Sequence, residues 1–133
     1  MFLDRLMNQT NAPLIERVLQ FSNARHKLIA ENMANVDTPG YRQKDLNEAK
    51  FFSLLRDRAA AKRANPPGTT EFANIDSNLE HPEKGILFHD QNNRSMEQLA
   101  SDQAKNGLLY TMAIELLRKQ FTAMEQALKE RVS

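Results

Sequence analysis

The first hydrophobic pattern with a helical period begins near Pro13 and continues to about Asn35. Apolar residues recur there at spacings of three and four, with the polar residues Arg25 and Asn32 in the same series. The stripe consists of Leu14, Val18, Phe21 and Leu28, and it is widened on one side by Ile15, Leu19, Ile29 and Met33. Proline suits the first turn of a helix, where its missing N–H would have no partner. We therefore expect a long amphipathic helix over residues 13–35.

A second hydrophobic pattern with a helical period occupies residues 95–133. Ser95 and Gln98 have the S-x-x-Q spacing of a capping box, which marks a helix start. The residues that follow keep a heptad spacing, and the stripe includes Leu99, Asn106, Tyr110, Leu117, Phe121 and Met124. At 1.5 Å per residue this helix would reach roughly 54 Å, against roughly 35 Å for the first helix. The first helix alone therefore leaves part of the longer stripe uncovered.

The remaining residues carry weaker patterns. Residues 1–12 predict a flexible N-terminal segment, because a helix this short is marginal in isolation. Within residues 36–94, a middle helix is expected over about 46–64, with Asp45 and Glu48 at a capping-box-like spacing. The rest of this region predicts a variable loop with short extended pieces at 69–75 and 85–90. The fold class is thus mostly α, with the terminal helices pairing as an antiparallel, coiled-coil-like layer.

The composition favours assembly over a large core. The chain is 41% hydrophobic, has a mean hydropathy of -0.62 and contains no tryptophan, so its apolar material is thin. A net charge of +1 argues against a nucleic-acid partner. The absence of cysteine excludes disulfides and thiolate catalysis. No apolar run is long enough to predict a membrane span, and the N-terminus lacks the pattern of a cleaved signal peptide.

The stretch from Glu31 to Arg42, ENMANVDTPGYR, ends the first helix with an ordered motif. Proline prevents the helix from continuing, and the glycine after it permits a positive φ. The motif resembles the signature A-N-x-A-N-x-x-T-P-G-Y of the bacterial flagellar axial proteins, which are the rod, hook and hook-associated subunits. The matching residues are Asn32, Ala34, Asn35, Thr38, Pro39, Gly40 and Tyr41, and Glu31 stands where the family more often has alanine. Asn106 and Tyr110 resemble a second family element, N-x-L-x-Y, in the C-terminal helix.

The short chain resembles the proximal-rod members of that family. The resemblance implies a structural subunit of the flagellar basal body, exported from the cytoplasm by the flagellar export apparatus without a cleaved signal. It implies polymerisation in the periplasmic rod with itself and other rod proteins, next to the membrane ring protein and the rod adaptor. Such a subunit transmits torque for motility through its packed terminal helices, and it needs no cofactor and no catalytic site.

For the turn motif, we expect that Asn32 and Asn35 form hydrogen bonds with freed backbone groups and that Tyr41 anchors the turn. We also expect the turn to direct the middle segment outward to a neighbouring subunit.

The residues alone leave an alternative function open, a cytoplasmic α-helical coiled-coil adaptor or regulator. Residues 56–63, RDRAAAKR, are interpreted as a solvated helix end rather than a nucleic-acid patch. The spacings of His26, His81 and His89 match no metal motif, so no metal site is expected.

Overall fold

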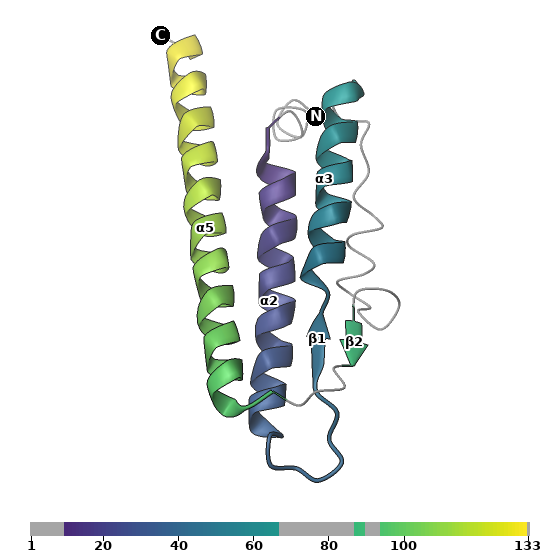
Figure 1. The fold of residues 1–133 in the computed structure, drawn as a ribbon. Coiled ribbons are helices and arrows are strands. Elements are labelled where there is room, and N and C mark those ends of the chain that lie inside the picture. The colour runs from purple at the N-terminus through teal and green to yellow at the C-terminus, as the bar shows by residue number, and fades with distance from the viewer. Residues whose placement is uncertain (1–9, 67–86, 90–93, 133) are drawn as a thin grey trace.

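The computed structural model describes residues 10–66, 87–89 and 94–132. Within these residues the chain forms helix α2 (Ala12–Ala34), strand β1 (Lys44–Leu46), helix α3 (Glu48–Ala64), strand β2 (Leu87–His89) and helix α5 (Met96–Val132) (Figure 1). The prediction of a mostly α-helical fold with long terminal helices is therefore confirmed.

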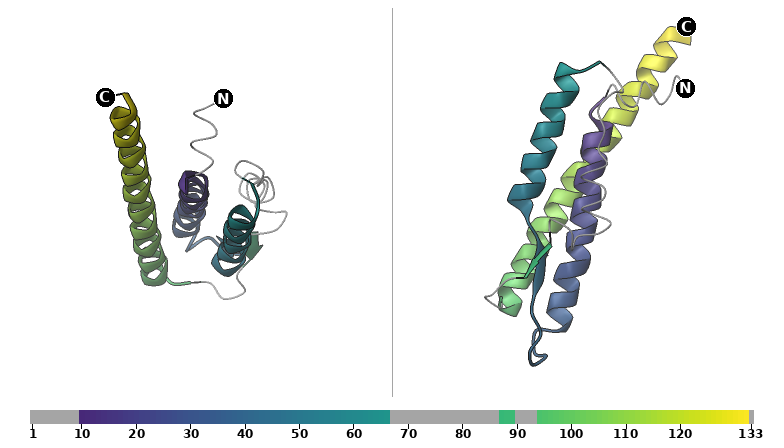
Figure 2. Two further views of the ribbon diagram at one scale, coloured as in Figure 1. Left: turned by 90° about the horizontal axis from the view of Figure 1, so that it is seen from above. Right: turned by 90° about the vertical axis from the view of Figure 1, so that its right-hand side faces the viewer.

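Helix α2 lies between α5 and α3, and its most extensive helix–helix contact is with α5 (Figures 1 and 2). The two terminal helices run in opposite directions along this contact, so the expected antiparallel pairing is confirmed. Helix α5 has 37 residues and α2 has 23, and α5 continues past the first turn of α2 (Figure 1).

The predicted start of the C-terminal helix is confirmed in atomic detail. The backbone N–H of Ser95 donates to Gln98 Oε1 at 3.1 Å, and the backbone N–H of Gln98 donates to Ser95 Oγ at 3.3 Å. These reciprocal bonds satisfy amide groups that the first turn of a helix leaves without a partner. At the other end of α5, Lys129 and Arg131 lie in the last turn, where their charge complements the helix dipole.

The predicted capping box at the start of the middle helix is wrong. Helix α3 begins at Glu48, and Asn47 is its N-cap, because the Asn47 side chain accepts a hydrogen bond of 3.0 Å from the backbone N–H of Lys50. Asp45 lies in β1 instead, and its carboxylate is bonded to the side chains of Arg25 and Arg94. An acidic residue with two arginine partners is not available to cap a helix.

The two strands form a small antiparallel sheet, with Lys44 opposite His89 and Leu46 opposite Leu87. Strand β2 falls within the extended piece expected over residues 85–90. The other extended piece, at residues 69–75, lies outside the described residues, as do residues 1–9 of the expected N-terminal segment. Residue 12, at the end of that expected segment, is instead the buried first residue of α2.

The hydrophobic core joins α2 to β1 and α3. Its fully buried members are Phe21, Leu46 and Phe51, and the rings of Phe21 and Phe51 stack with centroids 4.1 Å apart. Val18, Leu28, Phe52 and Leu55 pack around them, partly buried. One side of the α2 stripe therefore packs against β1 and α3, and the other side of α2 contacts α5.

Candidate functional site

The turn motif contains a β-turn from Thr38 to Tyr41. The backbone N–H of Tyr41 donates to the Thr38 carbonyl oxygen at 3.2 Å, and Gly40 has a φ of 75°. With Pro39 in the second position and a left-handed residue in the third, this is a type II turn. Glycine is required there because a side chain would strain that backbone conformation.

Asn35 closes the C-terminal end of α2. Its backbone N–H donates to the Glu31 carbonyl oxygen at 3.1 Å, and its side-chain Nδ2 donates to the same oxygen at 2.9 Å. Asn35 Oδ1 accepts a hydrogen bond of 3.3 Å from the Thr38 hydroxyl. Asn35 thus satisfies a freed backbone carbonyl group of the helix and also holds the first residue of the β-turn.

Asn32 joins the end of α2 to the strand that follows the turn. Its buried amide donates from Nδ2 to the Lys44 carbonyl oxygen at 2.6 Å and accepts at Oδ1 from the Lys44 backbone N–H at 3.0 Å. The Tyr41 hydroxyl donates to the same Oδ1 at 3.3 Å. Burial and the negative charge of Glu31 raise the pKa of Tyr41.

These contacts fold the chain back along α2. Strand β1 packs on α2, and α3 follows it, with Phe51 stacked on Phe21. The expectation that the turn directs the middle segment outward is therefore wrong for the residues that the structure describes. Ala34 is exposed at the end of α2 and carries no polar group into this arrangement.

A buried charge network lies next to the turn. Arg25 Nε donates to Asp45 Oδ1 at 2.9 Å and Arg25 Nη2 donates to Oδ2 at 3.1 Å. Arg94 Nη1 contacts Asp45 Oδ2 at 2.8 Å and Asp102 Oδ2 at 3.0 Å, and Glu48 also pairs with Arg25. Burial raises the pKa of Asp45, but the hydrogen bonds from the two arginines outweigh it, so the pKa lies below its ordinary value. The network fastens α2, β1 and the start of α5 together.

This network was not predicted from the sequence, although Arg25 gave a signal for it. A charged residue in the middle of an apolar stripe is usually paired when it is buried. Gln43 supports the same region, because its buried amide accepts from the Arg94 backbone N–H at 2.8 Å and donates to the Arg94 carbonyl oxygen at 2.9 Å.

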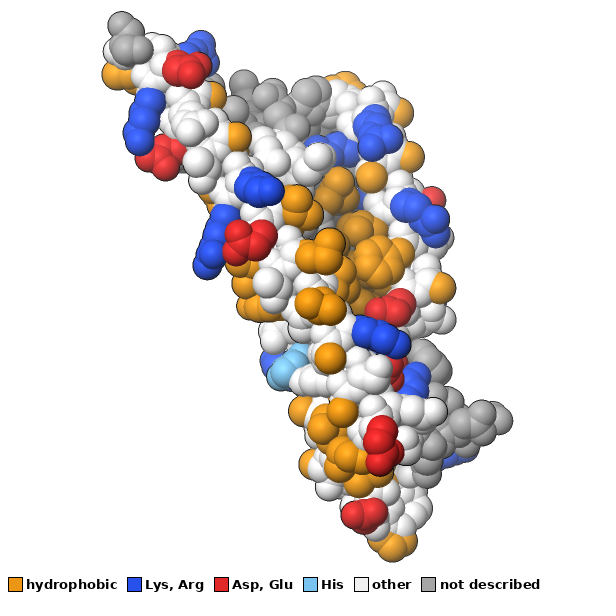
Figure 3. Space-filling model, turned by 60° about the vertical axis from the view of Figure 1, so that its left-hand side comes forward, with side chains coloured by type: hydrophobic (Ala, Val, Ile, Leu, Met, Phe, Trp, Pro, Cys, Tyr) orange, Lys and Arg blue, Asp and Glu red, His pale blue; other side chains and the backbone are white. Residues whose placement is uncertain are grey.

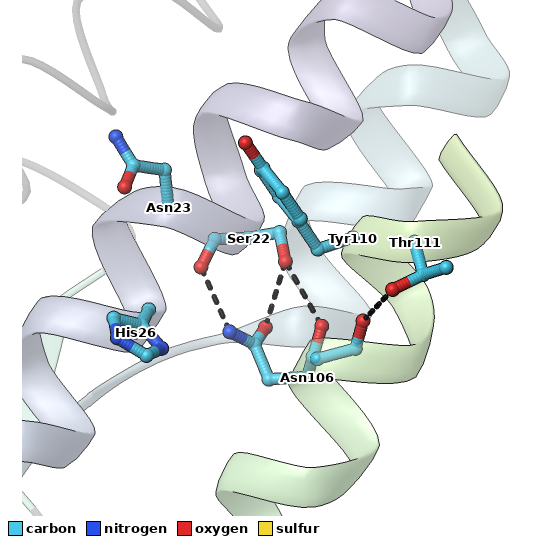
Figure 4. Close-up of a pocket in the computed structure, with 7 residues that line it drawn as sticks. Ser22, Asn23, His26, Asn106, Tyr110 and Thr111 are labelled. Atoms are coloured by element: carbon cyan, nitrogen blue, oxygen red, sulfur yellow. Dashed lines mark hydrogen bonds between the residues drawn. The ribbon is translucent and has the colours of Figure 1, made fainter. Parts of the chain in front are cut away.

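The contact between α2 and α5 has a polar pair at its centre (Figure 4). Asn106 Nδ2 donates to the Ser22 carbonyl oxygen at 2.8 Å. The Ser22 hydroxyl lies 3.1 Å from the Asn106 carbonyl oxygen and 3.2 Å from Asn106 Oδ1, so either oxygen can accept its proton. Both residues are buried, and they line a pocket of about 380 Å³. Asn23, His26, Gly107, Tyr110 and Thr111 complete the pocket.

The predicted stripe residues have three kinds of environment. Phe21, Leu99 and Asn106 are buried within the chain, and Leu14, Val18, Leu28, Leu117 and Met124 are half-buried. Tyr110 and Phe121 are exposed. Three further exposed apolar residues, Leu108, Met112 and Leu116, are spaced by four on another face of α5. Figure 3 shows hydrophobic side chains gathered along the middle of one face of the molecule, with charged side chains around them.

The basic segment over residues 56–63 ends α3, with Lys62 and Arg63 in its last turn. The interpretation of a solvated end is wrong for Lys62, whose ammonium group is partly buried and donates to the Thr10 carbonyl oxygen. Burial lowers the pKa of Lys62.

His26 is exposed and contacts Gln103. Within the described ranges, no group of three or more potential metal-ligating side chains occurs. None of the helices in the described part of the chain is both long and apolar enough to cross a membrane.

No protein-family model matches the chain. Curated relatives do match it, among them three proteins that each carry the name flagellar basal body rod protein FlgB. The Aquifex aeolicus relative is 27% identical over 118 residues, which cover 89% of this chain and 92% of the relative. The Bacillus subtilis relative is 24% identical over 86% of this chain and 89% of the relative, and the Aeromonas hydrophila relative is 25% identical over 84% and 86%. The resemblance predicted from the turn motif is confirmed by these matches, which extend over most of the chain.

Proposed function

The chain is related to the flagellar basal body rod proteins FlgB, and from this relationship we propose that it is a structural subunit of the proximal rod. In this proposal the subunit polymerises through its terminal helices and connects the membrane ring to the drive shaft. It transmits torque through that packing and catalyses no reaction. Its neighbours are further copies, other rod proteins, the ring protein and the rod adaptor.

The observation that carries the proposal is the continuation of the α5 stripe past α2. Leu99, Asn106 and Ala113 are seven residues apart and face α2, where they are buried. Leu117 and Met124 continue this face, and Phe121 and Leu128 lie three or four residues from them on the same side. Phe121 and Leu128 are exposed, although they belong to a face that is buried wherever α2 covers it.

An apolar face that extends beyond its own partner helix favours a neighbouring subunit as its cover. The second exposed series, Leu108, Met112 and Leu116, lies on a different face of the same helix. Two distinct apolar surfaces allow a heterologous contact, in which one surface of a subunit meets the other surface of the next. Such contacts generate helical filaments when the rotation does not close.

We infer that the assembled subunit lies in the periplasmic rod, after export from the cytoplasm by the flagellar export apparatus without a cleaved signal. The turn residues Asn32, Asn35, Thr38, Pro39, Gly40 and Tyr41 set the angle between α2 and β1 in each subunit. The exposed stripe residues Tyr110 and Phe121 and the half-buried Leu117 and Met124 supply the surface between subunits. The buried ones hold the subunit itself together.

The test is a charge placed on the exposed part of the stripe. Phe121→Asp should abolish swimming and remove the subunit from purified basal bodies, because an aspartate would be buried without a partner in the assembled rod. Thr122→Asp is the matched control, since Thr122 is exposed one residue further on and faces away from the stripe. Normal swimming and normal incorporation of Phe121→Asp would refute the proposal. A wild-type chain that remains a stable cytoplasmic dimer, absent from basal bodies, would favour an adaptor or regulator instead.

A further inference from the structure

The polar pair at the centre of the α2–α5 contact is unusual for its position. Ser22 and Asn106 are 1% and 2% exposed, and the positions one heptad away on α2 and α5 include the buried apolar residues Ile29, Leu99 and Ala113. Burying a hydroxyl and an amide is unfavourable unless each finds a hydrogen-bond partner. Each polar group of the pair bonds to the other residue, so the cost is offset in this alignment of the two helices (Figure 4).

The residues one heptad away show which other alignments of α5 on α2 the pair disfavours. Because the helices are antiparallel, Ile29 on α2 corresponds to Leu99 on α5, and Ile15 corresponds to Ala113. A slip of α5 by seven residues in either direction would bring Asn106 against one of the two isoleucines. The same slip would bring Ser22 against Leu99 or Ala113. Each alternative would leave the buried amide of Asn106 without its partner, whereas the apolar residues would pack in either alignment.

We propose that Ser22 and Asn106 are the residues that specify the register of α5 on α2. In coiled coils, a buried polar residue among apolar ones fixes the register at some cost in stability. The register decides how many residues of α5 extend past α2, and therefore which part of its apolar stripe is exposed. The register is a property of the single folded chain, so it does not depend on the assembly that the chain enters.

A competing determinant of the register lies at the start of α5. Arg94 is bonded to Asp45 and to both polar groups of the Gln43 amide, and these contacts fix the chain two residues before α5 begins. If this anchor alone set the alignment, the central pair would be dispensable. The experiment must therefore change the pair and leave Arg94, Asp45 and Gln43 intact.

The chain contains no cysteine, so two spin labels can be placed on it without removing any native cysteine. Labels at Ala30→Cys and Ala123→Cys occupy exposed positions on α2 and α5 that are well separated along the pair. In the wild-type background we expect a single distance distribution. In Ser22→Ala with Asn106→Leu we expect a second population, displaced by about 10 Å, because seven residues of a helix span that length. The helix content should be retained, since the replacements pack as apolar residues.

Two control variants separate register from general damage. Exchanging the pair, as Ser22→Asn with Asn106→Ser, keeps a matched donor and acceptor and should restore the single distance. Asn23→Leu removes an exposed amide from the same pocket and should leave the wild-type distance unchanged. A single wild-type distance in the double variant Ser22→Ala with Asn106→Leu would overturn the proposal and assign the register to the Arg94 anchor. Loss of helix content in that double variant, without rescue by the exchanged pair, would also overturn it.

Discussion

The side-chain amide of Asn32 forms two hydrogen bonds with the backbone of Lys44, and a neighbouring strand would form the same pair. Nδ2 donates to the carbonyl oxygen and Oδ1 accepts from the backbone N–H. Lys44 is the first residue of β1, so this contact fixes where the chain resumes after the turn. An asparagine suits this role because its side chain carries both a donor and an acceptor in one plane.

Replacing Asn32 should therefore loosen the junction between α2 and β1. We expect Asn32→Ala to lower the free energy of unfolding by about 2 kcal/mol, since two backbone groups lose their partners. Urea unfolding followed by circular dichroism measures this change. Asn35→Ala is the matched control, because its bonds lie at an exposed helix end where water can replace them, and its cost should be smaller. Equal losses of unfolding free energy for the two variants would show that the contact with Lys44 stabilises the fold no more than the exposed contacts of Asn35.

The elements that the sequence predicts well are those determined by residues close together in the chain. The capping box at Ser95 and Gln98, the end of α2 at the Thr-Pro-Gly turn and the heptad face of α5 all depend on spacings of a few residues. The contacts that were missed join distant residues. Arg94 and Asp45 are 49 positions apart, and Ser22 and Asn106 are 84 positions apart. Periodicity indicates which face of a helix is buried, but it does not indicate which element covers that face.

Phe21 illustrates this limit. Its place in an apolar stripe predicted burial, and burial is what the structure has, but its partner is Phe51 of the middle helix rather than a terminal helix. The Asp45 prediction failed for the related reason that a spacing suited to capping says nothing of two arginines that arrive from α2 and from residue 94.

The Asp45 network should make a large contribution to stability. We expect Asp45→Asn to lower the free energy of unfolding by about 3 kcal/mol, because it removes the buried charged partner of the Arg25 guanidinium and leaves only the half-exposed Glu48. Glu48→Gln is the control: Glu48 pairs with the same arginine, but its side chain is 48% exposed, so we expect a loss below about 1 kcal/mol. Denaturant unfolding at neutral pH measures both. A loss for Asp45→Asn no larger than that of Glu48→Gln would argue against a structural role for the buried carboxylate.

The same network predicts a pH dependence. The pKa of Asp45 is lower in the folded chain than its ordinary value of 3.8, so the folded state favours the charged form. Its contribution to stability is therefore complete above that ordinary value and is lost as the pH falls through the lower, folded-state pKa. The difference in unfolding midpoint between the wild type and Asp45→Asn should be largest near neutral pH and should shrink on acidification. A difference that stays constant down to the acid limit would contradict this assignment.

The two phenylalanines Phe21 and Phe121 should separate folding from assembly. Phe21 is 0% exposed and stacked on Phe51, so Phe21→Ala should cost the isolated chain about 4 kcal/mol. Phe121 is 44% exposed, so Phe121→Ala should change the stability of the isolated chain by no more than about 0.5 kcal/mol. In cells, however, Phe121→Ala should reduce swimming and incorporation into basal bodies. Full swimming with Phe121→Ala would mean that this ring is not covered by a neighbouring subunit.

Gly107 offers a substitution that should stabilise the isolated chain. It lies inside α5, where glycine is less favourable than alanine by about 1 kcal/mol. A Cβ at this position would meet no atom within 4 Å, so Gly107→Ala should raise the free energy of unfolding by about that amount. The hydrogen bond from the Thr111 hydroxyl to the residue 107 carbonyl should survive, because it uses only the backbone at that position. Thermal unfolding measures the gain in stability. A lower stability of Gly107→Ala would mean that the added methyl group clashes with the residues around the pocket beside Ser22 and Asn106. If a neighbouring subunit inserts a side chain into that pocket, the stabilised variant should nevertheless assemble less well, which basal-body purification would detect.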